Sequence, residues 1–133
     1  MEKKIEVGQS ASFAKTISET DVYLFAGISG DFNPIHVNTE YAKTSKFNRP
    51  IAHGILTAGL ISAVLGTQLP GPGAIYAKQE LKFLSPVYVG DTLTATCTVK
   101  EIIEDKNRVV MDCLVSNQDG TKVLAGDAVL ICQ

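Results

Sequence analysis

The chain has 133 residues, of which 45% are hydrophobic, and its formal net charge is −2. This length and composition predict a single domain over residues 1–133 with a buried apolar core, and they exclude a disordered chain. The basic residues are scattered, and no basic stripe or aromatic platform indicates nucleic acid as a partner.

The first elements of the chain are predicted to be short. Residues 11–16 are expected to form a strand, and Ser18 then gives a helix-start signal, because its hydroxyl can cap a first turn that is acidic. The apolar residues that follow share one helical face, and we expect Gly27 to end this helix. Asn38 is expected to cap a second short helix over residues 39–42.

Residues 55–69 form the longest helical pattern in the chain. The pattern is apolar on nearly every side, so we expect protein to surround this helix. Steps of four and three place Gly54, Ala58, Ser62 and Leu65 on one face, where the small residues would let a ligand approach closely. These residues could line a channel beside the helix. The alternative for Leu65 is core packing, which the pattern alone favours, whereas the hydroxyl of Ser62 would need a partner if buried.

After Gly73 the hydrophobic period changes from helical to alternating. Residues 75–83, 93–99, 109–115 and 122–132 are expected to form antiparallel strands, with turns at residues 105–107 and 119–120. An antiparallel sheet with one apolar face can wrap the long helix, which predicts an α+β fold. The edges of such a sheet remain open, so we expect the chain to pair into a dimer.

The compartment can be predicted from what these segments lack. Residues 1–7 have no apolar stretch typical of a secretory signal. A membrane span needs about 20 predominantly apolar residues, whereas residues 51–69 are interrupted by polar side chains, so we expect no membrane partner. Cys97, Cys113 and Cys132 are too far apart to predict a disulfide framework or a zinc site. We therefore expect a cytoplasmic protein.

The segment GDFNPIH, residues 30–36, contains the most informative pair of side chains. Asp31 and His36 are five residues apart, a spacing that turns them by roughly 140° on a helix and puts them on opposite faces of a strand. Gly30 and Pro34 favour an irregular turn instead, which can bring a carboxylate and an imidazole together for acid–base chemistry. The alternative is that Asp31 only stabilises its own turn.

Other residues are expected to support this pair. Asn33 precedes a proline, and we expect it to hold the loop through side-chain hydrogen bonds. Gly54 begins the long helix, where unpaired amides and the helix dipole can bind a developing negative charge. The alternative is that His53 and Gly54 only initiate this helix, with a solvated His53 ring. No GxGxxG, Walker or GxSxG motif is present and the histidines lack metal-ligand spacing, so we expect no metal and no cofactor.

Three segments of the chain resemble the (R)-specific enoyl-CoA hydratases, the hydratase 2 or MaoC-like dehydratase family. They are SGDFNPIHVNTEYA (29–42), RPIAHGILTAGLIS (49–62) and LPGPGAIYAKQELKFLSPVYVGDTL (69–93). The likeness is greatest to the short bacterial hydratases that supply polyhydroxyalkanoate synthesis. The resemblance implies a hot-dog fold, a homodimer, and reversible hydration of trans-2-enoyl-CoA to (R)-3-hydroxyacyl-CoA.

The resemblance also implies roles for particular residues. Asp31 and His36 match the family's catalytic pair, Gly54 matches the amide that holds the thioester oxygen, and Asn33 and Ser62 match supporting polar positions. We expect Leu65 and an inward-facing strand residue, Leu130 or its neighbour Val129, to bind the acyl chain. The alternatives are a dehydratase that acts on acyl-carrier-protein substrates, a hot-dog acyl-CoA thioesterase and an acyl-binding module without catalysis.

Overall fold

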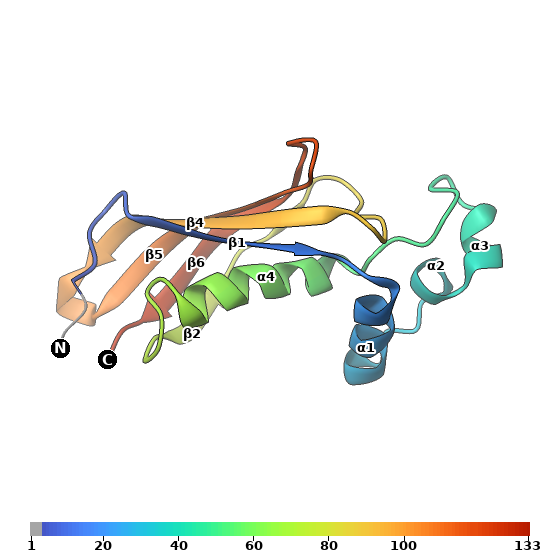
Figure 1. Cartoon of the computed structure of the whole chain (residues 1–133). Coiled ribbons are helices and arrows are strands. Elements are labelled where there is room, and N and C mark those ends of the chain that lie inside the picture. The colour runs from blue at the N-terminus through green and yellow to red at the C-terminus, as the bar shows by residue number, and fades with distance from the viewer. Residues whose placement is uncertain (1–3) are drawn as a thin grey trace.

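The computed structural model describes residues 4–133 (Figure 1), so the first part of the segment in which no secretory signal is expected lies outside the described residues. In chain order the elements are β1 (Ser10–Thr16), α1 (Glu19–Ser29), α2 (Pro34–Val37), α3 (Thr39–Lys43), α4 (Gly54–Thr67), β2 (Ile75–Gln79), β3 (Lys82–Phe83), β4 (Thr92–Ile103), a 3-10 turn (Glu104–Lys106), β5 (Arg108–Ser116) and β6 (Lys122–Ile131).

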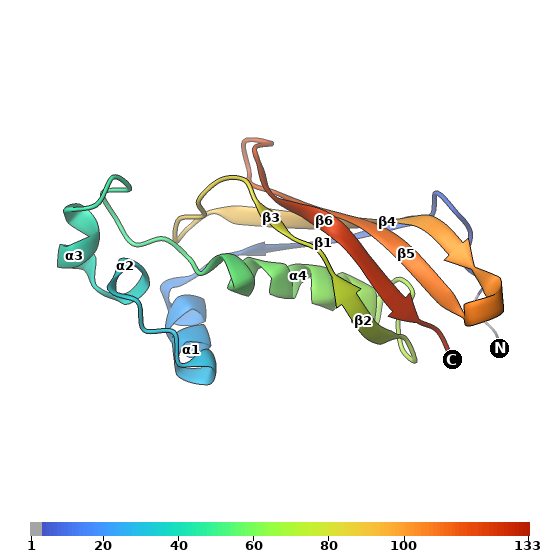
Figure 2. The same cartoon turned by 180° about the vertical axis from the view of Figure 1, so that it is seen from behind.

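The strands form one antiparallel sheet in the order β1-β4-β5-β6-β2, and β3 pairs separately with β6. Turns that need left-handed backbone connect the long strands, with Asn107 between β4 and β5 and Gly120 between β5 and β6. The sheet curves over α4 in both views (Figures 1 and 2). This arrangement confirms the α+β, hot-dog architecture.

The core lies between α4 and the inner face of the sheet. Alternate residues of β4 point inward, and they meet a helical stripe on α4 at the spacing expected for an amphipathic contact. Leu65 is buried in this core, and Leu130 points into it from β6 whereas Val129 is only half-buried. The inward residues of β4 are Leu93, Ala95, Cys97 and Val99, and the buried stripe of α4 is Thr57, Leu60, Ile61, Val64 and Leu65.

One face of α4 is open in the single chain. Ile55 is 53% exposed, and Gly59, Ser62 and Gly66 continue the exposed face at steps of four and three. The prediction that protein surrounds this helix is therefore wrong for one chain, because the sheet covers only the stripe that faces it. No helix within residues 4–133 is long and apolar enough to cross a membrane.

Local signals place the helix ends with one exception. The hydroxyl of Ser18 accepts from the Asp21 amide and the Asp21 carboxylate accepts from the Ser18 amide, a complete capping box. The prediction that Gly27 ends α1 is wrong. The helix continues to Ser29, and Gly30 caps it with φ 84°, because the chain reverses only there. Asn38 caps α3 as expected.

The alternating segment 75–83 is not one strand. It divides into β2 and β3, and the backbone between them crosses close to β6 at Gly126. A Cβ atom at Gly126 would lie 1.7 Å from the carbonyl oxygen of Glu80. Only glycine allows this approach.

Candidate active site

The loop between α1 and α2 shows how residues five apart come together. Gly30 reverses the chain, and Asp31 Oδ1 then accepts the Asn33 amide at 3.1 Å. Asn33 Oδ1 in turn accepts the Ile35 amide at 3.2 Å and so caps α2, in which Pro34 takes a first-turn position. His36 is therefore on a single helical turn that begins inside the segment we expected to be an irregular turn.

The ring of His36 is oriented by the segment before α4. Its Nδ1 lies 2.7 Å from the carbonyl oxygen of Ile51. An Nδ1–H donor to this carbonyl leaves Nε2 of the neutral ring with a free lone pair. The Ile51 amide also donates to the carbonyl of Ile35 at 3.2 Å, so the backbone at Ile51 is hydrogen-bonded to α2.

His53 lies between residue 51 and α4, and its ring is not solvated, which contradicts the alternative in which His53 only initiates the helix. Its side chain is 1% exposed. Its Nε2 lies 2.9 Å from the main-chain oxygen of Asp31, and its ring stacks on that of His36 with centroids 3.9 Å apart. Sequence reasoning missed this contact, although the chain has only two histidines and each belongs to a segment that was singled out.

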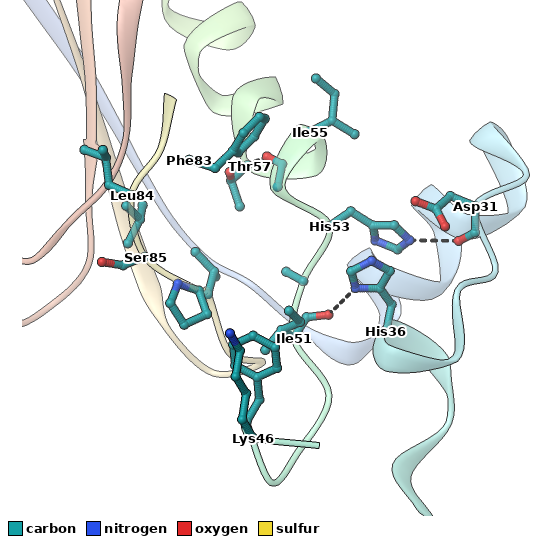
Figure 3. Close-up of a pocket in the computed structure, with 16 residues that line it drawn as sticks. Asp31, His36, Lys46, Ile51, His53, Ile55, Thr57, Phe83, Leu84 and Ser85 are labelled. Carbon is teal, nitrogen blue, oxygen red and sulfur yellow. Dashed lines mark hydrogen bonds between the residues drawn. The ribbon is translucent and has the colours of Figure 1, made fainter. Parts of the chain in front are cut away.

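Asp31, His36 and His53 converge at one point (Figure 3). A carboxylate oxygen and one nitrogen from each ring all lie within 4.8 Å of one another, a separation that a bridging water can span. The same spacing would suit a metal ion. However, each ring uses one nitrogen on a carbonyl, and rings stacked at 28° do not direct their remaining lone pairs at one point as tetrahedral ligands do.

The N-terminus of α4 lies beside these three side chains. Gly54 is the first residue of the helix, and the N-cap residue His53 gives no side-chain hydrogen bond to the first turn. The Gly54 amide thus has no acceptor within the helix, and it is at the positive end of the helix dipole. The ring of Phe83 packs on this glycine from β3.

A cavity of about 510 Å³ joins these features. Asp31 and His36 line one side of it, the N-terminus of α4 lines another, and the loop after β3 lines a third. Lys46 and Phe47 belong to the segment between α3 and α4 and also line it. The remaining lining residues are Ile51, Ala52, His53, Gly54, Ile55, Thr57, Phe83, Leu84, Ser85, Pro86, Val87 and Val123.

The other predicted residues lie elsewhere. Asn33 is exposed and caps α2, and Ser62 is exposed on the open face of α4. Leu65 and Leu130 are core residues and are not among those that line the cavity. The structure therefore brings Asp31, His36 and Gly54 together around one cavity, and it does not bring Ser62, Leu65 or Leu130 to it.

Comparison with known proteins shows the family to which this chain belongs. Residues 2–120 match the model of the MaoC-like domain. The chain belongs to the MaoC-like family. A relative from Rhodospirillum rubrum, named (R)-specific enoyl-CoA hydratase, is 57% identical over 96% of this chain and 88% of its own.

Solved structures of the family have the same fold. The (R)-hydratase from A. caviae involved in PHA biosynthesis superposes with a TM-score of 0.95 at 42% identity, covering 99% of this chain and 100% of that chain. The unliganded R-hydratase PhaJ1 from Pseudomonas aeruginosa gives a TM-score of 0.92 at 47% identity, covering 96% of this chain and 82% of that chain.

Proposed function

We propose that this chain is an (R)-specific enoyl-CoA hydratase, which adds water to trans-2-enoyl-CoA to give (R)-3-hydroxyacyl-CoA and catalyses the reverse dehydration. The observation that carries the proposal is the convergence of Asp31 and His36 within 4.8 Å at the wall of a cavity that also reaches Gly54. The similar proteins from R. rubrum and A. caviae, both named as hydratases, support the substrate class.

The geometry suggests a role for each group. A water held between Asp31 and His36 loses a proton to the Asp31 carboxylate as its oxygen attacks C3 of the enoyl thioester. His36 Nε2 orients this water, because Nδ1 is engaged by Ile51. The electron pair moves to the thioester oxygen, where the Gly54 amide and the helix dipole stabilise the enolate. A proton from the Asp31–His36 pair then adds to C2.

Asp31→Asn tests the assignment, because asparagine keeps the oxygen that accepts the Asn33 amide. The loop should survive while the base is lost, so turnover of crotonyl-CoA should fall about 10²–10⁴-fold with the melting temperature unchanged. Asp119→Asn is a matched control, because Asp119 lies in the exposed hairpin turn before Gly120, where asparagine is equally suitable. Near-normal turnover by Asp31→Asn would refute the proposal.

The same assay separates the alternative reactions. Loss of enoyl absorbance without release of free thiol indicates hydration, and thiol release indicates a thioesterase. Binding without either change indicates an acyl-binding module. Parallel rates with enoyl-CoA and enoyl-acyl-carrier-protein identify the carrier, and chiral analysis of the product checks the (R) configuration.

We propose that Leu65 and Leu130, which lie in the core and not on the cavity wall, influence the selection of acyl chain length, with Ser62 and Asn33 in supporting roles. Leu65 lies eleven residues beyond Gly54, about 16 Å along α4. An acyl chain that runs along the helix from the Gly54 amide reaches Leu65 only if it is long, so Leu65→Ala should change rates with long enoyl-CoAs more than with crotonyl-CoA. An equal effect at all lengths would argue for core packing alone.

The protein is proposed to act as a homodimer in the cytoplasm. On α1, Leu24 is 60% exposed and Ile28 84% exposed, and the open face of α4 adds Ile55. Large exposed apolar groups of this kind are typical of interfaces. Cys97 and Cys113 are buried and opposite one another on β4 and β5, and a reducing compartment would keep them as thiols. Light scattering coupled to size-exclusion chromatography measures the oligomeric state.

A further inference from the structure

His53 has an environment that packing alone does not explain. The ring is almost fully buried, and its Nδ1 has no hydrogen-bond partner among residues 4–133. A buried polar atom without a partner destabilises the folded state. An apolar side chain of similar volume would fill the same space without this cost, so the histidine must contribute something that an apolar residue does not.

The contacts of His53 reach each part of the proposed site. Nε2 lies 2.9 Å from the main-chain oxygen of Asp31, the ring face stacks on His36 at 3.9 Å between centroids, and the next residue along the chain is Gly54. On its other side, the ring of Phe25 from α1 lies 4.8 Å away at an angle of 57°. One side chain thus connects α1, the loop, α2 and the start of α4.

We propose that His53 is a positioning residue of the hydration reaction. It fixes the positions of the Asp31 loop, the His36 ring and the Gly54 amide relative to one another. This inference rests on the proposed function. Donation from Nε2–H fixes the Asp31 backbone, and the stacked face confines His36 to the orientation in which Nδ1 meets the Ile51 carbonyl. Because Nε2 carries the hydrogen, Nδ1 of the neutral ring is left bare.

Two variants separate the two contributions of His53. His53→Gln can place an amide N–H near the Asp31 oxygen but has no ring to stack on His36. His53→Phe keeps the stacked ring and the buried volume but lacks the donor. Misplacement by about 1 Å can cost about 10²-fold, so each variant should lower kcat about 10–100-fold. KM should change less than about threefold, since substrate binding does not require the reacting groups to be placed as accurately as the chemical step does.

A purely structural role predicts a different result. In that case the melting temperature and the soluble yield of the variants would fall, and kcat per folded molecule would stay at the wild-type value. His53→Phe is the stricter test. It removes the unpaired Nδ1, and this gain in stability opposes the loss of the one hydrogen bond, so we expect the variant to fold. A kcat within about threefold of wild type for both folded variants would overturn the proposal.

Ring ¹⁵N NMR gives a readout that does not depend on turnover. The chain has only two histidines, so each variant leaves the His36 ring as the single remaining signal. The proposal predicts the Nδ1–H tautomer of His36 in the wild type and in His53→Phe, and a mixture of tautomers in His53→Gln, where the stacked ring is missing. An unchanged His36 signal in His53→Gln would contradict it. A wild type inactive on enoyl-CoA would refute only the proposed reaction.

Discussion

Replacing Gly54 with alanine changes the space in front of the proposed oxyanion donor without removing the donor itself. An ideal Cβ at this position lies 2.6 Å from Cδ1 and Cε1 of Phe83, so the phenyl ring must move. Phe83 is 57% exposed, and the end of a flexible side chain can swing toward solvent at little cost. Alanine is also a better helix former than glycine by about 0.5–1 kcal/mol, so we expect Gly54→Ala to fold.

The effect on activity follows from the position of the new methyl group. It would stand where a thioester oxygen must approach the Gly54 amide, and loss of one oxyanion donor typically lowers kcat about 10²–10³-fold, or about 2.7–4 kcal/mol. KM should change less, because the hydrogen bond strengthens as the oxygen gains enolate charge. The assay is the loss of enoyl absorbance with crotonyl-CoA over a range of concentrations.

A double-variant cycle decides whether the methyl group or the displaced ring is responsible. Phe83 lines the cavity, so its movement could itself obstruct the substrate. If the methyl group blocks the amide, Gly54→Ala should cost the same factor in a Phe83→Ala background as in the wild type. If the cost disappears in that background, or if Gly54→Ala alone stays within about threefold of wild type, the Gly54 amide does not hold the oxygen.

Two further predictions concern stability. Gly126→Ala should destabilise the fold by about 1–3 kcal/mol, because a Cβ atom 1.7 Å from the Glu80 oxygen forces the backbone apart. Urea unfolding should show this loss, while Gly27→Ala, whose Cβ meets nothing within 4 Å on α1, should gain about 0.5–1 kcal/mol; equal midpoints for the two variants would contradict the close approach. The hydrogen bond from Lys15, assisted by Ser18, holds the pKa of Asp21 below its ordinary value, so this carboxylate stabilises the fold above the unfolded pKa of about 3.9 and loses the effect as pH falls through the lowered pKa. The difference in melting temperature between the wild type and Asp21→Asn should accordingly shrink from neutral pH to about pH 2, and a constant difference would show that charge is not its source.

Features with a local cause were predictable from the sequence. Ser18 and Asn38 cap helices because a short polar side chain precedes a helical pattern, and Gly120 turns a hairpin because glycine adopts positive φ. The wrong prediction that Gly27 ends α1 also has a local cause. A glycine within an amphipathic pattern can end a helix or continue it. The pattern therefore does not show that the chain reverses at Gly30 and not at Gly27.

Features that depend on tertiary packing were not predictable in the same way. Whether α4 is covered on all sides depends on how far the sheet curves and on whether a second chain is present, and neither can be read from an apolar pattern. The burial of His53 depends on Phe25, Asp31 and His36, which meet only after three helices have packed. The division of residues 75–83 into two strands depends on the close approach at Gly126.

The site is therefore better described as two facing segments than as a pair within one loop. Residues 30–36 supply the carboxylate and the imidazole, but the orientation of that imidazole is set by the Ile51 carbonyl and the His53 ring. The second segment is itself held by the bond from the Ala52 amide to the Val87 carbonyl at 2.7 Å. It follows that substitutions at residues 51–54 should reduce catalysis as strongly as many within residues 30–36, although only Gly54 among them is assigned a direct contact with substrate.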